Sequence, residues 1–260
     1  MDYDFTFAHR QEGFDEHINK SIRGYSELLN DVIAYSQYFV DSGTNVVDIG
    51  CSTGKLTERM IEKNFGVICD VNWIGVELAT GFVKPLRQRE ENLRKQFANE
   101  RISFIFDDIC NYEFNNCSLV TSIFTLQFMS PRKRKMVLQK LYDGLNEGGS
   151  FIMSEKTICE NANFQEMLTF NYYDYKRDSF STDDIMDKER ELRHMLKPNT
   201  YEEIIDMLND VGFSKTQCFW RNHMFWILTG TPRGENNLRS RVLEEFSGFF
   251  YQGSQKREQF

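Results

Sequence analysis

Three acidic positions and one glycine-rich turn have the spacing of a ligand site built at the ends of parallel strands. Asp48 lies in a β-branched apolar segment that breaks at Gly50, and Gly54 closes the turn that follows. Glu77 ends a second apolar segment, 29 residues after Asp48, and Asp108 follows a third. Glycine lets the backbone approach a ligand that a Cβ atom would displace, and an acid ending the second strand accepts hydrogen bonds from ribose hydroxyls. This spacing indicates binding of a nucleotide-like molecule.

The turn within residues 45–54 separates the classes of nucleotide site. It has no Gly-Lys-Ser/Thr and is therefore not a P-loop, and Ser52 stands where the dinucleotide fingerprint has its second glycine. Asp48–Gly54 instead resembles the Asp-x-Gly-x-x-x-Gly turn of class I S-adenosylmethionine (SAM) binders. In that class the turn approaches the amino-acid part of SAM, and the acid helps to orient the ammonium group. The alternative is a glycine-rich strand–helix turn that binds nothing.

Alternating strands and helices must position these residues. A helical stretch opens at residues 24–27 and runs through Phe39, and later helices are predicted at 55–63, 80–99, 131–145 and 200–211. The predicted strands are 45–49, 73–77, 102–106, 119–128 with its exit, 150–154, 214–220 and 225–229. This order predicts an α/β fold with a doubly wound, Rossmann-like, seven-stranded sheet of the class I SAM-dependent methyltransferase type.

The pattern changes after Lys156. An aromatic and polar stretch at 161–180 precedes a strongly charged one at 182–196, and we interpret 156–198 as an inserted helical cap over the ligand edge of the sheet. Residues 1–230 are then one SAM-binding domain that includes this cap. Residues 231–260 are predicted to be a C-terminal extension, either a docked helix around 242–251 or a loose tail.

Composition excludes several classes of protein. The 260 residues carry a formal net charge of −8, which argues against direct nucleic-acid binding apart from a local basic patch at Arg132–Lys135. Six scattered cysteines contain no Cys-x-x-Cys pair, so no metal site or disulfide scaffold is expected. No signal-peptide h-region and no apolar run of about 18 residues are present, which favours a cytoplasmic protein without a membrane span.

Six short segments resemble those of one family, in its order and at its approximate spacings. They are Gly24–Glu27, Asp48–Ser52, Phe124–Phe128, Gly144–Gly149, Ser154–Lys156 and Asp174–Arg177. The chain is similar in these segments to the carboxy-S-adenosyl-L-methionine synthases of tRNA wobble-uridine modification, from about Phe14 to about Thr229. The Gly-Tyr-Ser, Phe-Thr-Leu-Gln-Phe and Ser-Glu-Lys segments are more specific than the glycine turn, because ordinary methyltransferases lack the set.

The resemblance implies an unusual transferase reaction and a homodimer. Family members bind SAM, or hold carboxy-SAM, and take prephenate as a small-molecule second substrate. Prephenate loses carbon dioxide and water to give phenylpyruvate, and the SAM methyl group, acidified by the sulfonium, is thought to lose a proton and capture the carbon dioxide. Such a site needs a closed, dry pocket and a cation for the new carboxylate.

Carried over residue by residue, the resemblance predicts the ligand contacts and two departures from the family. Leu78 replaces an asparagine beside the ribose acid, and Ile123 replaces an asparagine before Phe124. The predicted cofactor-binding residues, including the two acids expected from the strand pattern, are Tyr25, Asp48, Gly50, Cys51, Ser52, Glu77, Leu78, Asp108, Ile109 and Ile123. Tyr25 is also expected to act in catalysis.

The position of the family's carboxylate-binding arginine falls on Glu189. A carboxylate there would repel the carboxylate of the product. A slip of one residue on the helix turns the side chain by about 100° and brings in Arg190, which we predict to be the catalytic cation. Arg193 is a second candidate, and solvated charges on an exposed helix are the alternative for both arginines.

Three functions are therefore compatible with the sequence. The first is a carboxy-SAM synthase with altered ligand contacts. The second is a SAM-dependent methyltransferase with a different acceptor, and the third is a non-catalytic protein on the same fold. Whether Arg190 or Arg193 points into the pocket beside Tyr25 and Ser52 should discriminate between the first function and the other two.

Overall fold

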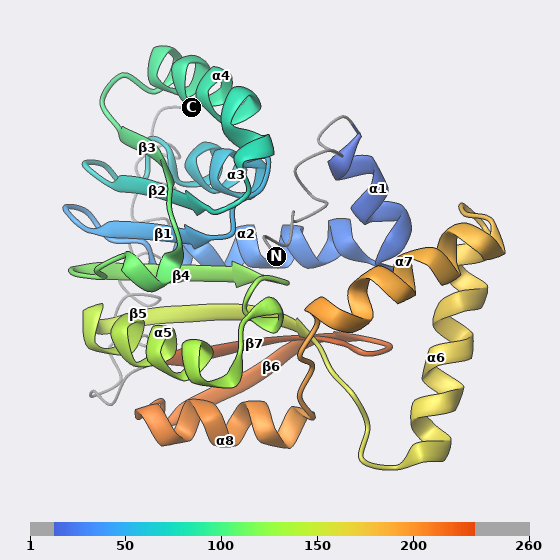
Figure 1. Ribbon diagram of the computed structural model, residues 1–260. Coiled ribbons are helices and arrows are strands. Elements are labelled where there is room, and N and C mark those ends of the chain that lie inside the picture. The colour runs from blue at the N-terminus through green and yellow to red at the C-terminus, as the bar shows by residue number, and fades with distance from the viewer. Residues whose placement is uncertain (1–12, 232–260) are drawn as a thin grey trace, which may run out of the picture.

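The computed structural model describes residues 13–231 and contains one seven-stranded sheet (Figure 1). The strand order is β3-β2-β1-β4-β5-β7-β6, and only the pairings of β7 with β5 and with β6 are antiparallel. The strands are β1 Asn45–Ile49, β2 Asn72–Glu77, β3 Arg101–Phe106, β4 Cys117–Ile123, β5 Leu145–Lys156, β6 Lys215–Asn222 and β7 Phe225–Thr231. The order reverses between β1 and β4, and open α/β sheets bind ligands at the carboxyl ends of strands at such a point.

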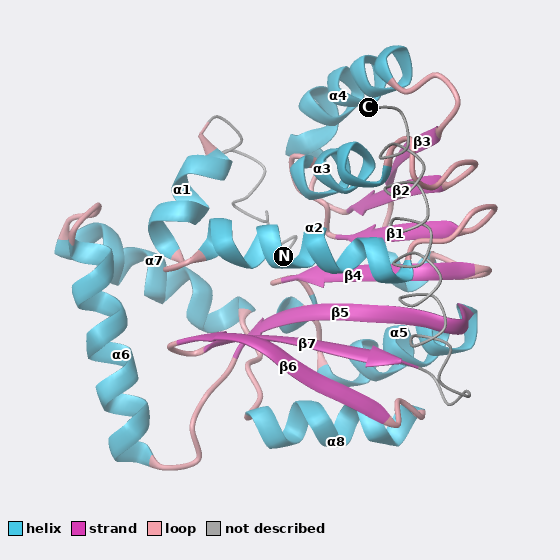
Figure 2. Ribbon diagram, turned by 180° about the vertical axis from the view of Figure 1, so that it is seen from behind, coloured by secondary structure: helices cyan, strands magenta, loops and turns pink. Residues whose placement is uncertain are grey.

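Helices cover both faces of the sheet. The helices are α1 Phe14–Ser21, α2 Tyr25–Phe39, α3 Lys55–Asn64, α4 Val83–Gln96, α5 Pro131–Gly144, α6 Ala162–Arg177, α7 Thr182–Met195 and α8 Tyr201–Val211, with 3-10 turns η2 Thr80–Phe82, η3 Ile109–Asn111 and η4 Leu126–Phe128. Helices α2, α3 and α4 pack on one face, and α5 and α8 on the other (Figures 1 and 2). Successive strand residues alternate between the two cores, as Val46 and Val47 do.

The prediction of a doubly wound, seven-stranded α/β fold is confirmed, and the differences lie at element boundaries. Strand β4 ends at Ile123, not within 124–128, because Phe124 has a φ of 57° and turns the chain out of the sheet. The helix predicted for 80–99 is divided into the turn η2 and helix α4. Among residues 13–231, no helix is long and apolar enough to span a membrane.

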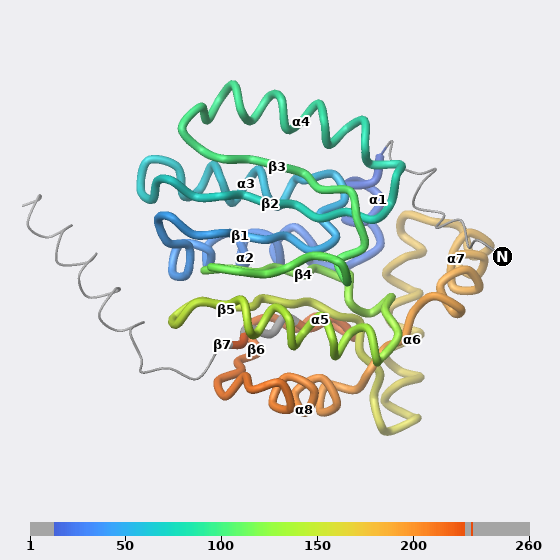
Figure 3. The backbone as a smooth tube through the Cα atoms, turned by 60° about the vertical axis from the view of Figure 1, so that its left-hand side comes forward, coloured from blue at the N-terminus to red at the C-terminus, as the bar shows by residue number. Residues whose placement is uncertain are grey.

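Residues 156–198 contain α6 and α7, which lie together beyond the carboxyl ends of the parallel strands (Figure 3). Each begins with a side-chain cap: Asn161 accepts from two N–H groups of α6, and Ser181 forms a capping box with Asp184 in α7. The C-terminal extension predicted for 231–260 lies, apart from Thr231, outside the described residues.

Strand β5 contributes a fully buried acid, Glu155, next to the guanidinium of Arg134 in α5. Burial raises the pKa of Glu155 from 4.5 to about 8, against the opposing effects of Arg134 and of the Leu126 N–H. Since the folded pKa exceeds the unfolded one, the unfolded chain loses this proton first as pH rises. The group therefore favours folding at low pH, and that stability is lost as pH rises from 4.5 to about 8.

Unfolding of Glu155→Gln should show this linkage directly. The free energy of unfolding of the variant, relative to the parent, should rise with pH between 4.5 and about 8, by up to ~1.4 kcal/mol per pH unit. Urea unfolding of both proteins at several pH values in this window measures the difference. Parallel stability profiles would show that Glu155 titrates normally in the folded protein.

Candidate functional site

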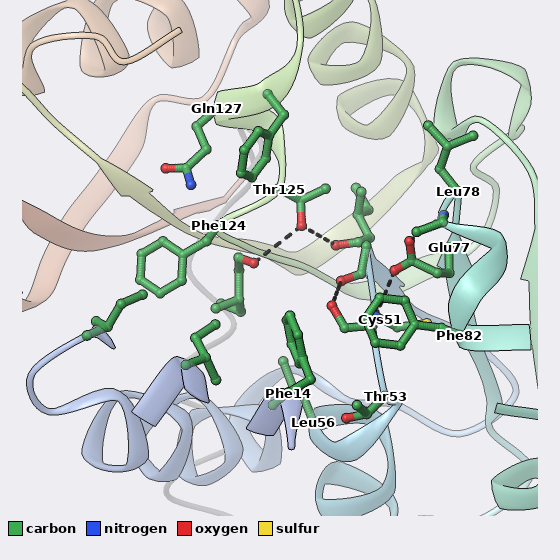
Figure 4. Close-up of a pocket in the computed structure, with 18 of the residues that line it drawn as sticks. Phe14, Cys51, Thr53, Leu56, Glu77, Leu78, Phe82, Phe124, Thr125 and Gln127 are labelled. Carbon is green, nitrogen blue, oxygen red and sulfur yellow. Dashed lines mark hydrogen bonds between the residues drawn. The ribbon is translucent and has the colours of Figure 1, made fainter. Parts of the chain in front are cut away.

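A cavity of about 560 Å³ opens at the carboxyl ends of the parallel strands, on the side covered by α1, α6 and α7. It runs from the glycine turn after β1 to Lys156 at the end of β5. Figure 4 shows the part of the cavity around Cys51, Glu77 and Thr125. All the predicted cofactor-binding residues line it: Tyr25, Asp48, Gly50, Cys51, Ser52, Glu77, Leu78, Asp108, Ile109 and Ile123. The topology thus brings together residues that are far apart in the sequence.

The glycine turn is held between β2 and the segment that follows β4. The N–H groups of Gly50 and Cys51 both donate to the Val76 carbonyl, at 2.8 and 3.3 Å. Gly50 has a φ of +68°, and a Cβ atom there would lie 2.3 Å from Thr125 Oγ1. Thr125 donates this hydroxyl to the Ile49 carbonyl at 3.0 Å. Glycine is therefore required here by close packing inside the protein as well as by backbone conformation.

The carboxylate of Glu77, the residue predicted to bind ribose, accepts hydrogen bonds from two backbone segments. One oxygen accepts from the Ser52 N–H at 2.8 Å and the other from the Ala79 N–H at 2.7 Å. Burial raises the pKa of Glu77, and these backbone donors oppose the shift. A carboxylate oxygen has two lone pairs, so Glu77 retains acceptor capacity toward hydroxyl groups in the cavity (Figure 4).

Asp48 lines the cavity, and its side chain accepts hydrogen bonds from two neighbouring elements. Its two oxygens accept from the hydroxyls of Thr57, in α3, at 2.9 Å and of Thr121, in β4, at 2.8 Å. Burial raises its pKa to about 6, although both hydroxyls favour the charged form. Asp48 therefore joins β1 to its neighbours, and the role predicted for it, orienting a ligand ammonium group, stays a prediction.

The adenine side of the predicted site is built after β3. Asp108 caps η3 by accepting from the Cys110 N–H at 3.0 Å, and its second oxygen pairs with Lys133 at 3.0 Å. Partial burial raises the pKa of Asp108, but the Cys110 N–H and Lys133 outweigh it and leave the pKa below its usual value. Ile109 is buried, whereas Leu78 is exposed at the rim of the cavity.

Aromatic rings form one continuous wall of the cavity. Tyr25 begins α2, and its ring centroid lies 6.3 Å from that of Phe124. The Phe225 ring continues the wall, with its centroid 5.4 Å from that of Phe124 and 5.6 Å from that of Tyr172. All four line the cavity. Burial raises the pKa of Tyr25, and the carboxylates of Asp15 and Asp48 raise it further, so its hydroxyl stays neutral near pH 7.

The structure does not bring Arg190 to the cavity. Its side chain is 73% exposed and pairs with Asp187 at 2.8 Å on the outer surface of α7, and Arg193 is exposed as well. The cations that do line this end are Lys156, Lys176 and Lys188. Lys156 and Lys176 stand out in the sequence only as members of the Ser-Glu-Lys and Asp-Tyr-Lys-Arg segments, because a single lysine does not show which way its side chain points.

The predicted basic patch at Arg132–Lys135 is largely neutralised. Lys133 pairs with Asp108, and Lys135 pairs with Asp210 of α8 at 3.1 Å. Arg134 is 2% exposed and donates to the carbonyls of η4 and of residues after α7. No group of acidic, histidine or cysteine side chains within 13–231 has the arrangement of a metal site.

Removing the Glu77 carboxylate should weaken binding of a SAM-type ligand. In Glu77→Ala the Ser52 and Ala79 N–H groups lose their acceptor and the cavity loses its hydroxyl acceptor, so we expect the Kd for SAM to rise roughly 10- to 100-fold. Isothermal titration measures the change, with Glu91→Ala on the exposed face of α4 as the control. An unchanged Kd would place the ribose elsewhere.

Comparison with known proteins places this architecture in a family. Residues 46–149 match the family described as methyltransferase domain. Carboxy-S-adenosyl-L-methionine synthase of Shewanella piezotolerans is 31% identical over 83% of this chain and 89% of its own length. The synthase of Staphylococcus epidermidis is 31% identical over 85% of this chain and 94% of its own length.

Solved structures agree on the fold. Magnesium protoporphyrin IX methyltransferase of Synechocystis with bound S-adenosylhomocysteine is 15% identical, with a TM-score of 0.58 over 88% of this chain and 98% of its own. A Haloferax volcanii methyltransferase in complex with its Trm112 activator is 12% identical, with a TM-score of 0.58 over 89% of this chain and 98% of its own. With this fold, and with about 31% identity to the synthases over most of its length, the chain belongs to the carboxy-S-adenosyl-L-methionine synthase family of SAM-dependent transferases.

Proposed function

We propose that this protein converts SAM and prephenate into carboxy-SAM, phenylpyruvate and water, in the cytoplasm, for the modification of tRNA wobble uridine. The observation that carries the proposal is the cavity, which is lined both by the SAM-type turn and by residues of the three most family-specific segments, Tyr25, Phe124 and Lys156. Prephenate supplies carbon dioxide and water when it forms phenylpyruvate, and SAM supplies a methyl carbon made acidic by its sulfonium.

The residues present fit SAM. Gly50–Ser52 offer backbone at the amino-acid end, Glu77 offers a hydroxyl acceptor, and Asp108 offers an acceptor for an amino group on the far side of β2. Leu78 and Ile123 supply apolar contact where the family has amides. The donor and acceptor set therefore suits a ribose, an adenine amino group and an amino-acid moiety along one edge of the sheet.

The cap suits a reaction that must retain carbon dioxide. Tyr172 and Leu192, from α6 and α7, line the cavity, and the aromatic wall links this cap to Tyr25. Exclusion of water protects a carbanion-like carbon from protonation and strengthens every charge interaction inside the site.

We also propose a homodimer. Helix α6 exposes an apolar stripe at i, i+3 and i+6, in which Phe164, Met167 and Phe170 are 60%, 64% and 60% exposed. Clustered apolar side chains of this size on one helix face favour burial against a second copy. Light scattering of the purified chain should give twice the monomer mass, and Met167→Lys should lower that mass.

A methyltransferase with a different acceptor is the second candidate. Glu189 stands where the family's carboxylate-binding arginine is expected, and it lies against Lys156 and Lys176. Ile123 removes a polar contact near the reacting group. Both replacements remove contacts that the family's reaction uses, and a methyltransferase would instead transfer the SAM methyl group to a separate acceptor.

Mass spectrometry of the small molecule released from freshly purified protein tests the choice. Carboxylated SAM is the expected result, and added SAM plus prephenate should regenerate it with phenylpyruvate. SAM or S-adenosylhomocysteine alone, with no turnover of prephenate, would favour the methyltransferase. A protein that neither carries nor takes up SAM would exclude both enzymes.

A further inference from the structure

Two lysines converge on one glutamate at the cap end of the cavity. Lys156 ends β5, Lys176 lies in the last turn of α6, and Glu189 lies on α7. The Lys156 Nζ atom is 3.9 Å from Glu189 Oε2, and the Lys176 Nζ atom is 4.0 Å from Glu189 Oε1. Both lysines line the cavity that a ligand would fill.

The cluster is buried and incompletely bonded. Lys176 is 4% exposed, and Glu189 Oε1 is buried with no hydrogen-bond partner among the described residues. Ion pairs near 4 Å are longer than the roughly 2.8 Å of a charge-assisted hydrogen bond. Burial lowers the pKa of Lys176 while Glu189 opposes the shift. Two lysines against one glutamate leave a net positive charge with donors to spare.

An apolar surface adjoins these charges. The Tyr172 ring lies 5.4 Å from the Lys156 ammonium and 5.1 Å from the Lys176 ammonium. Through Phe225 and Phe124 this ring continues the aromatic wall toward the SAM-type turn. A ligand with both a ring and an anionic group could therefore contact the aromatic wall and the two lysines at the same time.

We propose that Lys156 and Lys176 form a carboxylate-binding subsite, with Glu189 as an internal counterion that keeps the lysines charged and limits their affinity for the anion. The identity of the ligand rests on the proposed function, but the subsite does not. The carboxylate comes either from an aromatic carboxylic acid used as co-substrate or from the carboxyl group newly attached to SAM. In both cases the anion completes the bonding of a buried ammonium group.

Removing a lysine from the cluster should weaken anion binding, and removing the charge of Glu189 should strengthen it. Titration of prephenate and of phenylpyruvate into the full-length protein saturated with S-adenosylhomocysteine should give a Kd roughly 30-fold higher for Lys176→Met, with a smaller increase for Lys156→Met. Glu189→Gln should lower the Kd several-fold, because it removes the competing carboxylate. Arg177→Met, an exposed neighbour on α6 paired with Asp174, is the matched control and should leave the Kd unchanged.

A second arm separates the two sources of carboxylate. If the anion belongs to the product, Lys176→Met should raise the Kd of carboxy-SAM and leave that of SAM unchanged. Anion affinities that do not respond to Lys176, Lys156 or Glu189 in folded variants would overturn the subsite even if prephenate is turned over. Lysine-dependent binding without turnover of prephenate would support the subsite and reject the proposed reaction.

Discussion

Replacing Gly50 with leucine is expected to abolish SAM binding and to lower the free energy of unfolding by about 3 kcal/mol. Gly50 has a φ of +68°, and its added Cβ would meet Thr125 Oγ1 at 2.3 Å and Thr125 Cγ2 at 2.5 Å. Relief of that clash must move either the turn or η4, and both border the cavity. Isothermal titration with SAM and urea unfolding measure the two effects.

Gly43 offers a matched control for this substitution. Its φ of +72° is close to that of Gly50, but an added Cβ would meet nothing within 4 Å. Gly43→Leu should therefore show only the strain of the left-handed conformation, about 1 kcal/mol, with normal SAM affinity. In the milder Gly50→Ala variant, Thr125→Ala should restore part of the binding. A folded Gly50→Leu protein that still binds SAM would show that the turn is not at the ligand.

Arg134→Met should destabilise the protein by about 3–5 kcal/mol. This guanidinium donates to the carbonyls of Leu126 at 3.1 Å and Lys197 at 2.7 Å, and also contacts the side-chain oxygen of Asn199. Its loss removes these hydrogen bonds from a largely buried guanidinium and removes the cation that faces Glu155. Because these bonds tie η4 to the chain after α7, the rim of the cavity should loosen as well.

Lys135→Met is the control for Arg134→Met, because it removes an exposed cation from the next position of the same helix. Lys135 pairs with Asp210 at the surface, and such pairs contribute at most about 1 kcal/mol. Arg134→Lys should recover only part of the loss, since one ammonium cannot reach acceptors on two segments as the planar guanidinium does. Equal urea midpoints for Arg134→Met and Lys135→Met would contradict this role for Arg134.

The framework of the site could be predicted from sequence because its signals are local. The β-branched side chains of Val46, Val47 and Ile49 favour a buried strand, and this strand ends at Gly50. Parallel strands then carry Glu77 and Asp108 to one edge, whatever the details of packing. Both acids line the cavity, because topology alone determines which end of a strand faces the ligand.

The direction of side chains on helices could not be predicted in this way. On α7, Ile185 is buried, and Leu192 in its last turn and Leu196 just past its end line the cavity. Glu189 shares this inward face, since it lies near Lys156 and Lys176. Arg190 is rotated by about 100° from Glu189 and meets solvent. The same limit applies to Arg134, which a run of four basic residues does not distinguish from its exposed neighbours.

The amino-acid sequence by itself determined the succession of strands and helices along the chain, the glycine turn, and the acids near the ends of the second and third strands. Each of these depends on residues that are neighbours in the chain. Only the tertiary structure decided that Lys156, Lys176 and Glu189 meet, that Arg190 points away, and that Asp48 is bonded to two threonines. Those outcomes depend on how separate helices rotate and dock. Docking is determined by the summed burial of many side chains, so no short segment encodes it.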